Sequence, residues 1–318
     1  MENKTLDWEF YLQGFQDIHD CKALIFLFFL VLYIAALAGN TLIIAIVVTM
    51  ANLHSPMYFF ICNLSFGEII FTSNIIPNVL GAVMTEDGTI SVNGCFTQIF
   101  LFGCITVTEC SLLTIMSYDR YLAICIPLQY YTLMDFKLCR KLSVGAWAGG
   151  FILSIASCSL IYNLTYCGPY IIDHYFCDFL LVLKLSCLDT TIIDLETQTF
   201  SVLVTMPSFI FVCFTYFCII KAIIKIPSST GKDKAISTCS SHLTVVSIYY
   251  GSLIAIYVAP KQGHSYNMNK ILSLLYTTGT PISNPIIYSL RNKEMKKSFA
   301  KLIRWPFFND ENKVVRTK

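Results

Sequence analysis

The sequence predicts an all-α membrane protein, a bundle of seven transmembrane helices followed by a short amphipathic helix. Two observations predict this class. Only 13% of the 318 residues are charged and 55% are hydrophobic, whereas a soluble domain carries roughly a quarter charged residues. The chain also contains charge-free runs that are long enough to cross a bilayer, which takes about 20 helical residues. Because lipid cannot satisfy backbone polar groups, each crossing run is expected to be helical.

Seven charge-free runs account for the seven expected helices. The first run holds the first helix, the turn ANLHSPM and the start of the second helix, which the second run completes. Each later run holds one helix, and none alternates in the way that a barrel strand would. The runs are Ala23–Gly67, Ile69–Thr85, Gly88–Thr108, Leu142–Ile172, Thr197–Ile220, Ala235–Pro260 and Ile271–Leu290.

The distribution of basic residues predicts that the N-terminus is extracellular. With that orientation, 17 of the 22 Lys and Arg residues lie on the cytoplasmic side. Residues 1–22 are expected to form an extracellular segment without a cleavable signal peptide, residues 23–290 the transmembrane domain, and residues 291–318 a cytoplasmic tail. Asn3, in the motif NKT, is the favoured glycosylation site, whereas Asn163 lies close to the membrane and Asn63 inside a span.

Five of the 14 cysteines are expected outside the membrane, at positions 21, 95, 167, 177 and 187. The last three are spaced ten apart in one loop, which favours a loop stapled by disulfides in an oxidising compartment. Zinc binding, with His174 nearby, is the competing interpretation. Four of the five can pair and Cys21 is left over, but spacing alone leaves the connectivity open.

Other classes of membrane protein are not favoured. A secondary transporter would show an internal repeat, and the sequence has none. An enzyme would need a catalytic motif, but H-E-x-x-H, G-x-S-x-G and Gly-rich phosphate loops are all missing. The net charge of +2 gives no reason to expect a nucleic-acid partner. We therefore predict no enzymatic activity.

Several motifs together resemble a rhodopsin-like G-protein-coupled receptor. They are GN at 39–40, DRY at 119–121, Trp147 and NPIIY at 284–288. Four longer motifs resemble the signatures of vertebrate odorant receptors, and YSLRNKEMKK favours their class II branch. These are PMYFFICNLSFGEI at 56–69, SYDRYLAICIPLQY at 117–130, KAISTCSSHL at 234–243 and PISNPIIYSLRNKE at 281–294.

The resemblance implies a receptor for small volatile organic ligands that activates a stimulatory heterotrimeric G protein and raises cAMP. It pairs Cys95 with Cys177 and leaves Cys167 with Cys187; the alternative joins Cys95 to Cys187. Small departures from the family pattern occur at Ser117, Ser240 and Glu68. A chemosensor that works outside olfaction is the alternative function, because the sequence does not encode the tissue of expression.

The resemblance implies that Asp119 restrains Arg120 in the resting receptor and that Arg120 is released on activation. An arginine at a membrane edge is costly to bury alone. It can also serve merely as a topology anchor, because arginine snorkels at helix ends. The residues expected in the switch are Asp119, Arg120, Tyr121, Tyr216, His242 and Tyr288.

A second polar set is expected at mid-membrane depth and consists of Asn40, Glu68, Glu109 and Asn284. Carboxylates inside a membrane indicate function by default, and two that share one interior either share a proton or bind a cation. The resemblance implies a sodium ion at Glu68 and Glu109 that modulates the receptor. A hydrogen-bonded network with protonated glutamates is the alternative.

The resemblance also places an odorant cavity between the third, fifth and sixth helices. The expected lining is apolar with a few hydroxyl groups, which suits small, weakly polar molecules. It contains no charged anchor for a ligand, so amine ligands are not expected. Ordinary packing is the alternative for each of these residues, which are Phe102, Gly103, Thr106, Val107, Phe200, Val204, Tyr250, Leu253, Ile254 and Tyr257.

Overall fold

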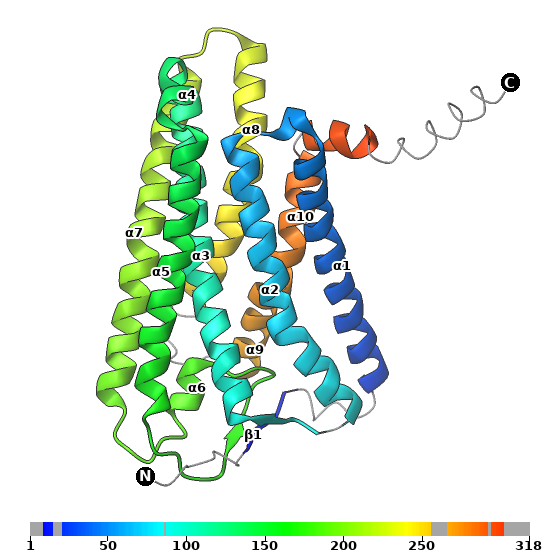
Figure 1. The fold of residues 1–318 in the computed structure, drawn as a ribbon, viewed down its shortest axis with the longest axis vertical. Helices are drawn as coiled ribbons and strands as arrows, with labels where there is room; N and C mark the ends of the chain where they lie inside the picture. Colours follow the sequence, from blue (N-terminus) through cyan, green and yellow to red (C-terminus); the bar gives the residue numbers. More distant parts are fainter. Residues whose placement is uncertain (1–8, 15–20, 86, 256–265, 292–293, 302–318) are drawn as a thin grey trace, which may run out of the picture.

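The structure, a computed structural model, describes residues 9–14, 21–85, 87–255, 266–291 and 294–301. Long helices run side by side along one axis (Figure 1). Six of the described helices are uninterrupted over 25 residues or more, and a further helical run contains a π-helical stretch. The long elements are α1 (Lys22–Thr49), α2 (Pro56–Thr85), α3 (Val92–Cys125), α5 (Phe136–Tyr162), α7 (Thr191–Ile224), α8 (Ser229–Leu253) and α9 (Tyr266–Leu274), which continues through the π-helical Leu275–Gly279 into α10 (Thr280–Arg291).

Five of these helices, namely α1, α2, α3, α5 and α7, are long and apolar enough to cross a membrane. Their large apolar side chains are widely exposed, as at Leu24 on α1, Phe151 on α5 and Leu203 on α7. A soluble protein rarely leaves so much contiguous apolar surface in water. The remaining helices, α8 and the α9–α10 run, pack into the same bundle against α3, α2 and α1.

The helix α3 lies at the centre of the bundle and packs against α2, α5, α7 and α8. Its first turn is capped by Ser91, whose hydroxyl accepts a hydrogen bond from Gly94 N at 3.1 Å. Such a cap satisfies one of the backbone N–H groups that a helix start leaves without a partner. Because α3 runs the full length of the bundle, it connects the residues of both ends.

A capping residue also fixes the start of α8. The Ser228 hydroxyl accepts from Gly231 N at 3.3 Å, and α8 begins at Ser229. The connection between α7 and α8 is therefore short, and residues 229–233 belong to the helix.

A small three-stranded sheet closes one end of the bundle, which we call the sheet end. Strand β1 (Glu9–Leu12) pairs antiparallel with β2 (Thr89–Ser91) and parallel with β3 (Ile171–Ile172). Phe10 of β1 is fully buried in a second apolar core with residues of α3 and of the segment before α7. The all-α prediction missed this sheet, to which the N-terminal residues 9–12 contribute the central strand.

Two disulfides fix the long segment between α5 and α7 at the sheet end. Cys95 of α3 is bonded to Cys177, and Cys167 is bonded to Cys187. These are the pairs that the family resemblance implied. Cys21, at the start of α1, carries a free and exposed thiol. The segment also contains the short helix α6 (Phe179–Leu183), which lies at the lower end of the bundle in Figure 1.

The opposite end carries the short helix α4 (Tyr130–Leu133) and a helix over residues 294–301. The latter lies at the upper right edge of the bundle in Figure 1, at an angle to the long helices. Its residues Met295 and Ser298 are buried against the bundle, and Ser298 Oγ accepts from Asn52 Nδ2 at 3.2 Å. Phe299 packs against the main core, so the expected amphipathic helix is present over the described residues. Leu302 and Ile303, which the sequence pattern places on the same apolar face, lie outside the described residues.

Candidate functional site

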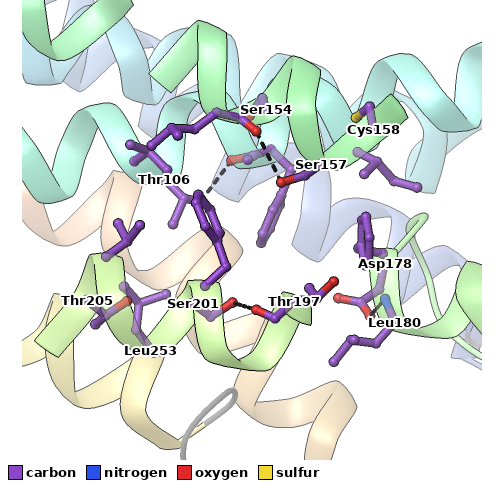
Figure 2. A pocket seen from close by; sticks show the side chains of 18 of the residues that line it. Thr106, Ser154, Ser157, Cys158, Asp178, Leu180, Thr197, Ser201, Thr205 and Leu253 are labelled. Atoms are coloured by element: carbon purple, nitrogen blue, oxygen red, sulfur yellow. Dashed lines mark hydrogen bonds between the residues drawn. The ribbon is translucent and has the colours of Figure 1, made fainter. Parts of the chain in front are cut away.

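A cavity of about 150 Å³ lies between α3, α5 and α7, beneath the segment that follows Cys177. Its wall is mostly apolar, with hydroxyl groups distributed over the three helices. In Figure 2, Ser154 and Ser157 of α5 lie on one side, and Thr197 and Ser201 of α7 lie on the other. The lining residues are Ile99, Phe102, Gly103, Thr106, Val107, Cys110, Leu153, Ser154, Ser157, Cys158, Cys177, Asp178, Phe179, Leu180, Thr197, Gln198, Phe200, Ser201, Val204, Thr205 and Leu253.

Two glycines allow α3 and α5 to approach closely along the cavity wall. A Cβ added at Gly103 would lie 2.7 Å from Ser154 Oγ, and one at Gly150 would lie 2.4 Å from Cys104 O. Neither distance is compatible with a normal van der Waals contact. The absence of a side chain at these positions therefore sets the width of the cavity on this side.

Seven of the ten residues that the resemblance placed in a ligand cavity line this one: Phe102, Gly103, Thr106, Val107, Phe200, Val204 and Leu253. Tyr250 does not, because its hydroxyl lies 3.4 Å from Cys110 Sγ and from Thr114 Oγ1. Ile254 also lies outside the lining. Tyr257 is outside the described residues.

The sequence reasoning missed the contribution of α5 and of the segment after Cys177. Leu153, Ser154, Ser157 and Cys158 come from α5, so the cavity lies between the third, fourth and fifth long helices. Asp178 brings a carboxylate to the rim, although the expected lining was uncharged. The disulfide between Cys95 and Cys177 was the available signal, because it ties this segment to the start of α3.

At the opposite end of α3, Asp119 and Arg120 form an ion pair within the bundle. Asp119 Oδ2 accepts from Arg120 Nη2 at 2.5 Å and from Nε at 3.0 Å. The other carboxylate oxygen, Oδ1, accepts from the hydroxyl of Tyr130 in α4 at 2.7 Å. The Asp119 side chain has 0% exposure and that of Arg120 11%, so the pair is shielded from solvent. Tyr130 was not among the predicted residues.

Three further predicted residues lie near this ion pair in the bundle. Tyr216 of α7 and His242 of α8 stack, and Tyr216 OH lies 2.7 Å from His242 Nδ1. Tyr288 of α10 is buried, and its hydroxyl has no partner among the described residues. Tyr121 instead stacks on Tyr118 of the same helix. The structure therefore gathers most of the predicted switch around Arg120.

The second polar set is brought together in part. Asn284 Nδ2 of α10 donates to Glu68 Oε1 of α2, and Glu109 is close enough to Glu68 for the two carboxylates to interact. Asn40 Nδ2 donates to the carbonyls of Ala36 and Pro281, both at 3.0 Å. Within the described part of the chain, buried oxygens without a partner remain on all four residues: Asn40 Oδ1, Glu68 Oε2, Glu109 Oε1 and Asn284 Oδ1.

Comparison with known proteins now identifies the family. The sequence model of the olfactory receptor family matches residues 29–304. Human olfactory receptor 5A2 is 45% identical over 94% of this chain and 92% of its own length. Human olfactory receptor 6N1 is 43% identical, over 93% and 95%, and human olfactory receptor 6B1 is 43% identical, over 95% and 96%.

The chain belongs to the olfactory receptor family. Its members are seven-helix membrane receptors and not enzymes, and the predicted class is confirmed. As an olfactory receptor it has odorants as its ligands and couples to G proteins.

The cavity of this olfactory receptor is covered by a segment that polar contacts fix to α9. Lys270 Nζ of α9 lies 2.5 Å from Asp173 Oδ1 and also donates to Gly14 O at 3.3 Å. The neighbouring His174 is buried and stacks against Phe176 and Tyr175. Burial, with the nearby Lys270 charge, lowers the pKa of His174 to about 3, so the imidazole is neutral at physiological pH.

Proposed function

We propose that this olfactory receptor binds a small volatile molecule in the cavity between α3, α5 and α7, and that binding activates a stimulatory heterotrimeric G protein and raises cAMP. The supporting observation is that one continuous helix, α3, contributes both to the cavity and to the Asp119–Arg120 pair. Thr106 and Arg120 are 14 positions apart, which is about 21 Å along a helix. A change at the cavity can therefore reach the pair through one rigid element.

In the proposed orientation the sheet end is extracellular and the opposite end is cytoplasmic. Both disulfides lie at the sheet end, and disulfides persist in the oxidising compartments outside the cytosol. The basic residues Lys137, Arg140 and Lys141 lie in the first turns of α5, at the opposite end. An excess of lysine and arginine is characteristic of the cytoplasmic side.

At the cytoplasmic end, Asp119 holds Arg120 in the resting state and is itself held by the hydroxyl of Tyr130. A guanidinium without a counter-ion is costly to bury, so Arg120 remains inward-facing as long as Asp119 accepts its N–H groups. Activation would move α8 relative to α3 and release Arg120 toward the G protein. Tyr216, His242 and Tyr288 would then provide polar groups near the released side chain.

Glu68 and Glu109 would hold a sodium ion in the resting bundle. Sodium prefers oxygen ligands, and the partnerless oxygens of these two residues and of Asn284 fit that preference. The ion would supply a positive charge between two carboxylates that otherwise repel each other. Losing it would favour the arrangement in which one of the glutamates is protonated.

The test is a cAMP measurement in cells that express the chain with an extracellular epitope tag. We expect a panel of small volatiles to contain ligands that raise cAMP, and substitution of Arg120 by alanine to abolish that response at equal surface level. Signals are divided by the surface epitope signal. If volatiles bind but never raise cAMP, the coupling to a stimulatory G protein is wrong.

A further inference from the structure

One hydroxyl in the cavity wall differs from its neighbours. Ser154 of α5 lines the cavity and its side chain is only 4% exposed. Its Oγ has no hydrogen-bond partner in the part of the chain that the structure describes. A buried hydroxyl without a partner costs about 1–3 kcal/mol relative to a satisfied one. Such a group in a ligand cavity indicates a bond that the ligand completes.

Four of the other hydroxyl groups around the cavity already donate their proton within their own helices, in contrast to that of the half-buried Thr205. A hydroxyl has one proton, so each of these four groups can offer a ligand only its oxygen as an acceptor. The bonds are Thr106 Oγ1 to Phe102 O at 2.8 Å, Ser157 Oγ to Leu153 O at 3.1 Å, Thr197 Oγ1 to Ile193 O at 2.7 Å and Ser201 Oγ to Thr197 O at 2.9 Å.

Ser154, by contrast, retains its proton as a donor. It sits where α3 carries Gly103, and a Cβ at that position would lie 2.7 Å from Ser154 Oγ. The hydroxyl therefore occupies the space that a side chain at position 103 would fill, beside the cavity that Ser154 lines. Because the hydroxyl hydrogen can rotate, it can point toward a ligand atom in the cavity. The group that completes the bond must then be an acceptor.

The rim carboxylate does not offer a comparable site for a cationic ligand. Asp178 Oδ1 accepts from the backbone N–H groups of Leu180 and Leu181, at 3.0 and 3.3 Å, and so caps the start of α6. A carboxylate in that role is held at the helix terminus. An amine would have to compete with the cap, whereas an oxygen acceptor meets an unused donor at Ser154.

We infer that the ligands of this receptor are neutral carbonyl compounds, namely ketones, aldehydes or esters, whose oxygen accepts a hydrogen bond from Ser154. The inference rests on the proposed function, because it specifies the ligand of the same cavity. The apolar wall holds the rest of the molecule. A protein cavity of about 150 Å³ accommodates benzene, so the ligand has on the order of six to ten non-hydrogen atoms.

The experiment compares matched ligands on matched variants. Methyl pentyl ketone, pentanal and butyl acetate represent a panel of short carbonyl compounds, heptane and octane the hydrocarbons, and hexylamine the amines. The variants are Ser154→Ala, which removes the donor, Ser154→Cys, which keeps a weak donor, and Ser159→Ala. The last is the control, since it deletes a hydroxyl of the same helix that lies outside the cavity lining and whose proton is already bonded to Ala156 O. Concentration–response curves for cAMP are divided by surface epitope signal.

We expect carbonyl compounds to be the activating class on the unmodified receptor. Ser154→Ala should raise their half-maximal concentrations by roughly three- to tenfold, the value of one hydrogen bond. Ser154→Cys should give values between those of the unmodified receptor and those of Ser154→Ala, and Ser159→Ala should stay within about twofold of the unmodified receptor. If hydrocarbons or hexylamine activate as well as the carbonyl compounds, or if the two alanine variants behave alike, the inference is wrong. If no volatile of any class activates a receptor present at the surface, the proposed function itself fails.

Discussion

Replacing Asp119 by asparagine should raise signalling in the absence of ligand. The carboxylate is fully buried and accepts three hydrogen bonds, two from Arg120 and one from Tyr130. Asparagine keeps the shape and an acceptor oxygen for Tyr130 but removes the charge that holds the guanidinium. The substitution therefore weakens the resting state while leaving the packing of α3 in place.

The size of the effect follows from the energy of the lost ion pair. Coupling between two receptor states is typically about 1–3 kcal/mol, which is a factor of about 5 to 150 in their equilibrium. If the resting receptor is active in about 1% of molecules, the variant would be active in roughly 5% to 60%. Basal cAMP per surface receptor should rise accordingly.

The control is Asp135→Asn, which neutralises another acidic residue at the same end of the bundle. Asp135 caps α5 by accepting from Leu138 N at 2.8 Å, and asparagine caps helices about as well as aspartate. It should leave basal cAMP unchanged. Arg120→Ala should instead abolish the odorant response. If Asp119→Asn and Arg120→Ala both match the unmodified receptor after correction for surface level, the pair only fixes topology and the switch is refuted.

Three further predictions concern the polar set, the covering segment and the cavity wall. Glu109→Gln should weaken the dependence of basal cAMP on external sodium; an unchanged sodium response would favour a purely structural network. Burial lowers the pKa of His174 from 6.5 to about 3. When the covering segment unfolds, the imidazole regains its ordinary pKa and binds a proton that the folded segment excludes. The stability of the folded receptor should therefore fall as the pH decreases below about 6.5. Thermal melting of the purified receptor should show a loss of about 2 kcal/mol at pH 5, and His174→Gln should remove most of it. Gly103→Ala should place a methyl group against Ser154 and weaken the response to every ligand at unchanged surface level; an unaltered response would show that ligands bind elsewhere.

The helices were predictable from the sequence because lipid imposes one requirement on every crossing segment, namely the absence of charge. The sheet was not predictable in the same way. Strand β1 consists of four residues, and its partners β2 and β3 lie about 80 and 160 positions further along the chain. A strand this short carries no reliable alternation, and its existence depends on tertiary contacts, such as the burial of Phe10.

The lining residues of the cavity were predictable only on α3, α7 and α8, where the family resemblance indicates which positions face a ligand. Ser154 lies in α5, a helix whose composition is apolar nearly all round, so nothing in the sequence distinguishes the face toward the cavity from the face toward lipid. Tyr130 was missed for a different reason. Its contact with Asp119 depends on how the chain turns after Pro127, which residue spacing does not specify.

The hydrogen bonds of Thr106 indicate where a bound ligand would first affect α8. A ligand shifts a receptor only through contacts that differ between its two states. Thr106 lines the cavity, its carbonyl accepts from Tyr249 OH of α8 at 2.6 Å, and its hydroxyl lies 3.0 Å from Tyr276 OH. Nearer the start of α8, His242 contacts Tyr216 of α7. The helix α8 is thus held to α3 beside the cavity and to α7 near Arg120. A ligand that displaces Thr106 would loosen the contact with α3 while the contact with α7 remains. The helix α8 would then turn about the contact between His242 and Tyr216.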